Sequence, residues 1–288
     1  QTDPSTITPA NPTVSIEYSG ELVEFDNNGH EYQIIRNMRL ETTTSFSDVV
    51  NFRSSGNGNN AWFDNVEFFG GTSTTTSTGN AVISANGGDN VHVTNCTFTR
   101  GSHAIYESGG SSWTVTGNTI NPMRDNAIEL RGSNNHIADN EIKGTLNTGT
   151  TDNVYLLGSG NNVINNNIEY SNGWGSALYS GGQNDSIAGN FIDLTSTNTR
   201  GCYGIEVRGD GSRVYDNEVV SKNVRDDVYC YYFSGDEINA MNNKAISEST
   251  SGFTRWRGFY VSGDGTVSNR QIIANNLIHQ SDPNFWGN

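Results

Sequence analysis

Apolar and polar residues alternate in short segments along most of this chain, and these segments recur at regular intervals. One motif reads apolar-x-x-Asn-x-apolar. It surrounds Asn95, Asn118, Asn140, Asn166, Asn190 and Asn217, with weaker copies at Asn37, Asn65, Asn243 and Asn276. Successive asparagines lie 22 to 33 residues apart. A period of this length is typical of stacked supersecondary units.

A second motif, a short alternating segment followed by Gly or Ser, precedes each asparagine. Its apolar residue leads the asparagine by twelve positions in four consecutive repeats: Ile128 to Asn140, Val154 to Asn166, Leu178 to Asn190 and Ile205 to Asn217. The apolar spacing of two predicts strands, not helices. A hairpin meander does not require whole-repeat periodicity, whereas parallel stacking does. The stacked asparagines are then expected to hydrogen-bond along the axis as a ladder.

The predicted fold is therefore all-β, a single-stranded right-handed parallel β-helix of about ten coils. Residues 1–13 are polar and contain proline, and we expect a flexible leader there. Residues 14–46 are predicted to form capping strands and the first coil, and residues 47–288 the remaining β-helix.

These repeats resemble the pectin-lyase-like right-handed parallel β-helix superfamily over roughly residues 34 to 280. The resemblance implies the same fold. The superfamily includes polysaccharide lyases, glycoside hydrolases, epimerases, viral tailspikes and surface proteins. Because one fold serves all of these activities, the function has to be inferred from particular side chains.

The charge of the chain excludes several classes of partner. The formal net charge is −15, with 16 Lys and Arg residues against 31 Asp and Glu residues. An acidic surface disfavours nucleic acids and anionic membranes. No apolar run reaches the ~18 residues of a membrane span, so no membrane insertion is expected. The chain starts at Gln1 without Met, as a processed, exported protein does. We therefore expect an extracellular, cell-surface or virion-surface location.

Strand alternation predicts which side chains point outward from the second motif. One outward column contains Tyr106, Glu129, Tyr155, Tyr179, Glu206, Tyr229 and Tyr260, and Arg131, Arg208 and Tyr231 lie two positions further along. Trp174 and Trp256 precede two of these strands and are predicted to form a rim. Aromatic rings stack on sugars, and carboxylates and guanidinium groups pair with their hydroxyls. These residues therefore predict a polysaccharide or surface glycan as the partner. Tyrosines and Glu–Arg pairs also suit an ordinary exposed sheet.

Cleavage of the glycan would require a pair of acids. Glu206 and Asp227 are expected one coil and two residues apart, roughly 8 Å, with Arg208 beside them. Such a cluster suits an inverting hydrolase, whose carboxyl groups stand roughly 6.5–9.5 Å apart, or a lyase. Asp226 and Asp227 also form a candidate calcium pair, although a solvated turn explains them equally well. A β-helix needs no cofactor to fold.

Two functions follow from the sequence. In the first, the chain is a secreted or surface β-helix that binds polysaccharide along this face, with or without cleaving it. In the second, it is a non-enzymatic structural or adhesive protein, a filament or spike subunit. Lightly capped ends, which expose unpaired strand edges, favour this second function through homo-oligomer or filament assembly.

Overall fold

The computed structural model describes most of the repeating region of the chain. The described residues are 15–18, 22–25, 32–43, 48–53, 58–71, 81–146, 149–171, 174–195, 201–222, 227–248, 255–262 and 271–280. The predicted leader, residues 1–13, and the predicted boundary at residues 46 and 47 lie outside them. That division of the chain stays a prediction.

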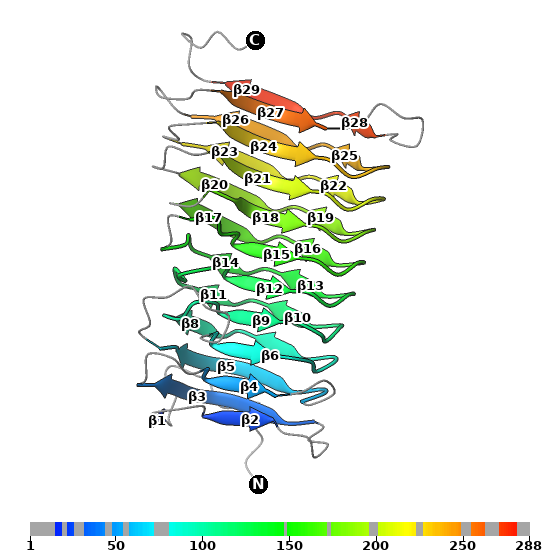
Figure 1. Cartoon of the computed structure of the whole chain (residues 1–288). Coiled ribbons are helices and arrows are strands. Elements are labelled where there is room, and N and C mark those ends of the chain that lie inside the picture. The colour runs from blue at the N-terminus through cyan, green and yellow to red at the C-terminus, as the bar shows by residue number, and fades with distance from the viewer. Residues whose placement is uncertain are drawn as a thin grey trace, which may run out of the picture.

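All regular structure in these residues is β-strand, arranged in two sheets that run the length of the molecule (Figure 1). The larger sheet has 19 strands: β1 (Ser15–Tyr18), β3 (Ile34–Thr42), β5 (Trp62–Phe69), β7 (His92–Thr94), β8 (Thr97–Thr99), β10 (Thr114–Thr116), β11 (Thr119–Ile120), β13 (His136–Ala138), β14 (Glu141–Ile142), β16 (Asn162–Ile164), β17 (Asn167–Ser171), β19 (Ser186–Ala188), β20 (Phe191–Thr195), β22 (Arg213–Tyr215), β23 (Glu218–Ser221), β25 (Asn239–Met241), β26 (Lys244–Ser247), β28 (Ile272–Ala274) and β29 (Leu277–Gln280). The smaller sheet has 10 strands: β2 (Val23–Phe25), β4 (Val50–Phe52), β6 (Ile83–Ala85), β9 (Ile105–Glu107), β12 (Ile128–Leu130), β15 (Val154–Leu156), β18 (Ser176–Ser180), β21 (Cys202–Val207), β24 (Val228–Phe233) and β27 (Trp256–Val261).

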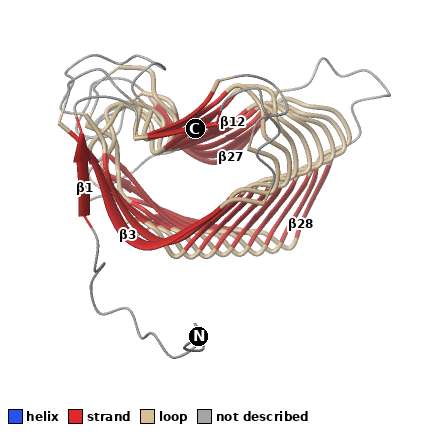
Figure 2. Ribbon diagram, turned by 90° about the horizontal axis from the view of Figure 1, so that it is seen from below, coloured by secondary structure: helices blue, strands red, loops and turns tan. Residues whose placement is uncertain are grey.

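Each strand pairs in parallel with its counterpart in the next coil, so the predicted parallel β-helix is confirmed. The 10-stranded sheet takes one strand from each coil. Viewed along the axis, the 19-stranded sheet is bent into a trough that faces the 10-stranded sheet (Figure 2). No helix long and apolar enough to cross a membrane occurs among the described residues.

The asparagine ladder lies at the bend of the larger sheet. The residue before each ladder asparagine has a left-handed backbone, as at Asp139 (φ 56°) and Asn165 (φ 54°). The backbone and side-chain nitrogens of Asn140 both donate to Oδ1 of Asn166, at 3.0 and 2.8 Å. The same pattern links Asn118, Asn140, Asn166, Asn190, Asn217, Asn243 and Asn276. The ladder therefore satisfies buried backbone groups at the bends from Asn118 to Asn276.

Three of the ten predicted ladder asparagines do not occupy the ladder position. Asn37, Asn65 and Asn95 are themselves the left-handed residues, with φ of 55°, 53° and 55°. Cys96 stands at the ladder position instead, and its backbone nitrogen donates to Oδ1 of Asn118 at 2.8 Å. The expectation was wrong by one residue because asparagine also favours left-handed turns.

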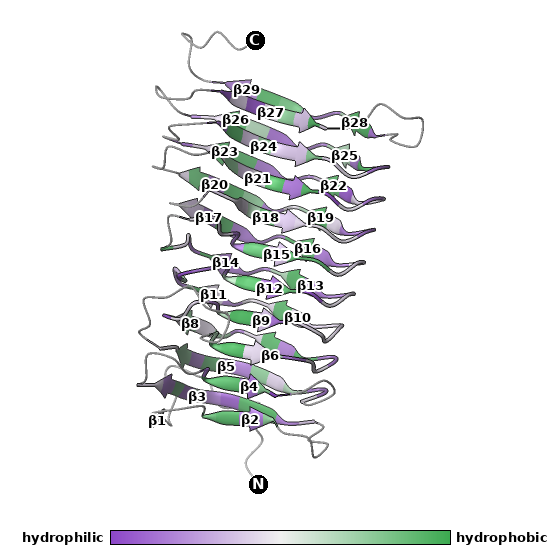
Figure 3. Ribbon diagram, viewed as in Figure 1, coloured by the Kyte–Doolittle hydropathy of each residue, from purple (hydrophilic) through white to green (hydrophobic). Residues whose placement is uncertain are grey.

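Inward side chains of successive coils stack on one another and fill the core. Phe25 stacks on Phe52 with ring centroids 4.5 Å apart, and Phe68 stacks on Phe98 at 4.9 Å. Strands β9, β12 and β15 show the hydrophobic residues that face this core (Figure 3). The stacking aligns the outward side chains in columns as well, and this alignment builds the site described next.

A column of glycines forms the corner after the 10-stranded sheet. A Cβ on Gly132 would lie 1.4 Å from the carbonyl oxygen of Gly110, and one on Gly158 would lie 1.9 Å from that of Gly132. Gly182 and Gly209 repeat the arrangement, at 1.8 and 1.5 Å. The coils therefore approach each other here more closely than any side chain permits.

Candidate functional site

The outer surface of the 10-stranded sheet carries a mixed column of tyrosines and glutamates. Register pairs the members in the order Tyr106, Glu129, Tyr155, Tyr179, Glu206, Tyr232 and Tyr260. Three positions earlier in each strand lies a second outward column, which holds Ser176, Tyr203, Tyr229 and Arg257. These two columns, with the Arg131 and Arg208 side chains that follow them, are called the acid–tyrosine face below.

The predicted column is wrong in β24, where alternation fails. Tyr229 pairs with Tyr203, not with Glu206, and Tyr232 takes the predicted place of Tyr229. Tyr231 was expected to face solvent, but it is fully buried, and its hydroxyl donates to the carbonyls of Asn217 and Lys244 at 2.9 and 3.0 Å. Cys230 and Tyr231 are adjacent and both buried. The two outward tyrosines of β24, Tyr229 and Tyr232, are therefore three positions apart, instead of two.

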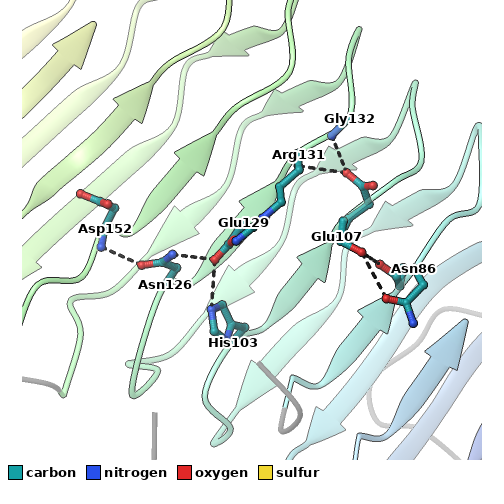
Figure 4. Close-up of polar contacts among 10 residues, drawn as sticks. Asn86, His103, Glu107, Asn126, Glu129, Arg131, Gly132 and Asp152 are labelled. Carbon is teal, nitrogen blue, oxygen red and sulfur yellow. Dashed lines mark hydrogen bonds and ion pairs between the residues drawn. The ribbon is translucent and has the colours of Figure 1, made fainter. Parts of the chain in front are cut away.

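Glu129 lies on the outer face, but its neighbours cover it almost entirely, leaving 4% of the residue exposed. Arg131 contacts its Oε1 at 2.7 Å, while Asn126 donates to its Oε2 at 2.9 Å and His103 Nε2 lies 3.4 Å from the same oxygen (Figure 4). Burial opposes ionisation of this carboxyl group. The hydrogen bonds of His103, Arg131 and Asn126 outweigh burial and lower the pKa of Glu129.

Glu206 has a similar arginine clamp three coils further along the axis. Nη2 and Nε of Arg208 lie 2.6 and 2.7 Å from its Oε1. Its Oε2 accepts a hydrogen bond from the Ser176 hydroxyl at 2.6 Å. Only 3% of Glu206 is exposed. The predicted association of Glu206 with Arg208 is therefore present, and Ser176 is an additional partner.

Asp152 lies between the two clamped glutamates. Its Oδ1 accepts the backbone N–H of Ser176 at 2.5 Å, and its own backbone N–H donates to Oδ1 of Asn126 at 2.8 Å. Desolvation by burial is the main cause that raises the pKa of Asp152 to about 7, and the negative charge of Glu206 adds to it. Ser176 thus bridges two carboxyl groups, one through its N–H and one through its hydroxyl.

The prediction that Asp227 lies near Glu206 is wrong. Val228 pairs with Cys202, so Asp227 lies beside Gly201, five residues before Glu206. At about 3.3 Å per residue this separation is about 16 Å along the strand. The Asp227 carboxylate contacts Arg255 at 3.1 Å.

Only one residue of the candidate calcium pair, Asp227, belongs to the part of the chain that the structure describes. Asp226 lies outside the described residues. Within the described part of the chain, no group of three or more His, Cys, Asp or Glu residues is arranged to hold a metal ion. Calcium at Asp226 and Asp227 stays a prediction.

The tyrosine rings of the acid–tyrosine face stack on one another. Tyr155 and Tyr179 are nearly parallel, with centroids 4.8 Å apart, and Tyr232 stacks on Tyr260 at 5.3 Å. The Arg208 guanidinium lies 5.6 Å from the centroid of the Tyr179 ring. Because ring faces cover one another, the groups presented to a ligand are ring edges and phenol hydroxyls.

The two predicted rim tryptophans differ in their placement. Trp174 is 39% exposed and precedes β18. Trp256 pairs with the buried Val228 and packs against the core, and its indole N–H donates to the Ser221 hydroxyl at 2.8 Å. The predicted rim position of Trp256 is therefore wrong.

Sequence reasoning missed the second outward column. His103, Asp152 and Ser176 each lie three residues before a predicted outward residue, and strict alternation assigns that position to the inside. The available signal was that a polar residue stands three positions before the outward residue in successive repeats. Of the missed residues, His103 lies against Glu129 and Ser176 donates to Glu206, in addition to the predicted arginines.

Together the fold and this face define a parallel β-helix in which one sheet carries acidic, aromatic and arginine side chains on its outer surface.

No family model matches the chain, and no curated protein matches it. The chain is similar in structure to the Streptococcus pneumoniae surface protein and adhesin PfbA, with 12% identity over 89% of each chain and a TM-score of 0.46. It is also similar to the receptor-binding domain of the Siphovirus 9NA tailspike, with 10% identity over 96% of this chain and 73% of that one and a TM-score of 0.25.

Proposed function

We propose that this protein binds a polysaccharide along the acid–tyrosine face and is located outside the cell, on a cell surface or on a virion. The observation that carries the proposal is the column in register along the sheet, in which each coil presents either a tyrosine hydroxyl or a glutamate paired with an arginine. Successive coils are about 4.8 Å apart. A polysaccharide is itself a linear array of hydroxyl groups, so a chain lying along the axis meets partners at every coil.

The hydroxyls of Tyr155 and Tyr179 are expected to contribute directly to glycan affinity. A double Tyr155→Phe, Tyr179→Phe variant keeps the stacked rings and removes only the two hydroxyls. Each hydrogen bond contributes about 0.5–1.5 kcal/mol, so we expect about tenfold weaker binding. A glycan array identifies the ligand, and calorimetry with the strongest binder measures the loss.

Tyr32→Phe is the control, because Tyr32 is 72% exposed and lies away from the face. If the double variant bound as tightly as the unchanged protein, or if no glycan bound at all, the proposed function would be wrong.

Hydrolysis of the bound glycan is a second candidate function, favoured by the Asp152–Ser176–Glu206 bridge. Two hydrogen bonds of 2.5 and 2.6 Å and one serine separate the carboxyl groups. An inverting hydrolase uses two carboxyl groups roughly 6.5–9.5 Å apart, which leaves room for the attacking water. Asp152, with its raised pKa, is the candidate acid that protonates the leaving oxygen. Glu206 is the candidate base that takes a proton from the attacking water.

Asp152→Asn is expected to lower turnover by at least about 100-fold while leaving glycan affinity nearly unchanged. Since the acid must be protonated, activity should fall as the pH rises through about 7. The folded chain holds this proton more tightly than the unfolded chain. The same group therefore loses its stabilising contribution as the pH rises from 3.8 to about 7.

Release of reducing ends from the bound glycan measures this activity. Asp193→Asn, which breaks an ion pair with Lys222 on the other sheet, is the matched control. Binding without any release of reducing ends would exclude hydrolysis and leave the binding function intact.

A further inference from the structure

A groove of about 560 Å³ lies on the 19-stranded sheet, away from the acid–tyrosine face. Strands β19, β22 and β25 and the turns that precede them form it. Its lining includes Asn184, Ser186, Arg213, Tyr215, Asn239 and Met241. Register brings Ser186, Arg213 and Asn239 into one outward column, and Tyr215 and Met241 into another.

Arg213 supplies an uncompensated positive charge in this groove. It is exposed, and no carboxylate of the described residues lies within 4 Å of its guanidinium. Asp185 also lines the groove, but it is fully buried, and its carboxylate accepts hydrogen bonds from Ser180 and Asn161 at 2.6 and 2.8 Å. In a chain with a net charge of −15, such an arginine favours an anionic ligand.

The neighbours of Arg213 fit a polyhydroxylated ligand. The side-chain oxygen Oδ1 of Asn239 is buried and has no hydrogen-bond partner in the described part of the chain. A buried acceptor without a donor is costly, so a rotation of the Asn239 side chain that brings Oδ1 to a ligand hydroxyl in the groove would relieve this cost. The hydroxyls of Ser186 and Tyr215 lie 3.4 Å apart and can donate or accept. Met241 is 38% exposed and offers an apolar contact for the C–H groups of a sugar ring.

We infer that this groove is a separate binding site for an acidic sugar, a hexuronic acid residue whose carboxylate pairs with Arg213 and whose hydroxyls bind Asn239, Ser186 and Tyr215. The planar guanidinium fork matches the two oxygens of a carboxylate. The inference does not depend on the acid–tyrosine face, because the two sites lie on different sheets.

Tetragalacturonate and its fully methyl-esterified form provide a pair of probes, since esterification removes the negative charge of each carboxyl group and adds one methyl group to it. The acid is expected to bind at least about tenfold more tightly than the ester. NMR titration is expected to shift the side-chain signals of Arg213 and Asn239. Arg213→Gln should weaken binding of the acid by at least about tenfold and leave binding of the ester unchanged.

Arg53→Gln removes the same charge from the other sheet and is expected to leave both affinities unchanged. Equal binding of the acid and the ester would overturn the inference, as would unshifted Arg213 and Asn239 signals at millimolar acid. The double Tyr155→Phe, Tyr179→Phe variant separates the two sites. If it abolished binding of the acid while Arg213→Gln had no effect, the probe would occupy the acid–tyrosine face and not this groove.

Discussion

Gly182→Ala is expected to destabilise the protein by more than about 4 kcal/mol, the range of the most damaging single substitutions. The new methyl group would lie 1.8 Å from the carbonyl oxygen of Gly158 and 2.5 Å from its carbonyl carbon. Both are backbone atoms of the neighbouring coil, so the only relief is to separate two coils that hydrogen-bond at this corner. Urea denaturation followed by circular dichroism measures the change in the free energy of unfolding.

The adjacent glycine is the matched control for this experiment. A Cβ on Gly181 would meet only side-chain atoms of Tyr179 and Leu157, at 3.0 Å or more, and these can move. Gly181→Ala should therefore cost less than about 1 kcal/mol. Equal destabilisation by the two substitutions would show that close approach of the coils does not explain the glycine column.

Asn166→Ala is expected to cost about 3 kcal/mol or more, because it leaves several buried groups without partners. Oδ1 of Asn166 accepts both the backbone and the side-chain N–H of Asn140, and its Nδ2 donates to the carbonyl of Ile137 at 2.9 Å. The free energy of unfolding in urea again provides the measurement. The loss of these bonds should also weaken the bends on either side of the substituted coil.

Asn167→Ala tests whether the cost is specific to the ladder. Asn167 follows directly in the sequence, but it is exposed and lies outside the ladder. Its replacement should change stability by about 0.5 kcal/mol or less. A similar loss from both variants would contradict the role assigned to the ladder.

The repeat predicted the fold well because parallel stacking makes equivalent residues pair at fixed offsets. The twelve-residue lead of Ile128 over Asn140 and of Ile205 over Asn217 reflects two sheet positions that the structure keeps in register from coil to coil. The pattern was ambiguous for asparagine, because this residue occurs both in the ladder and in the left-handed turn beside it. Asn95 occupies a left-handed turn beside the ladder, and its neighbour Cys96 takes the ladder position.

The candidate site was predicted only in part, since it depends on departures from alternation. Glu129, Tyr155, Tyr179 and Glu206 share the predicted column. In β24, however, adjacent residues Cys230 and Tyr231 both turn inward. Sequence alone does not show such a local distortion, because both residues are apolar enough for the core. This distortion explains why Asp227 was predicted beside Glu206. Asp152 was missed for a different reason, because the second outward column breaks alternation.

The fixed arc between the 10-stranded sheet and the ladder determines where this molecule tolerates change. An added residue between Gly132 and Asn140 would shift the ladder asparagine relative to the glycine corner, because this stretch has the same length in successive coils. The connection from β14 to β15 carries no such constraint. The repeat period of 22 to 33 residues varies chiefly in this connection and in the corresponding connections of the other coils. Diversification can thus proceed one loop at a time while the scaffold stays constant. Foreign peptides grafted into these loops would be displayed in a row with the spacing of the coils.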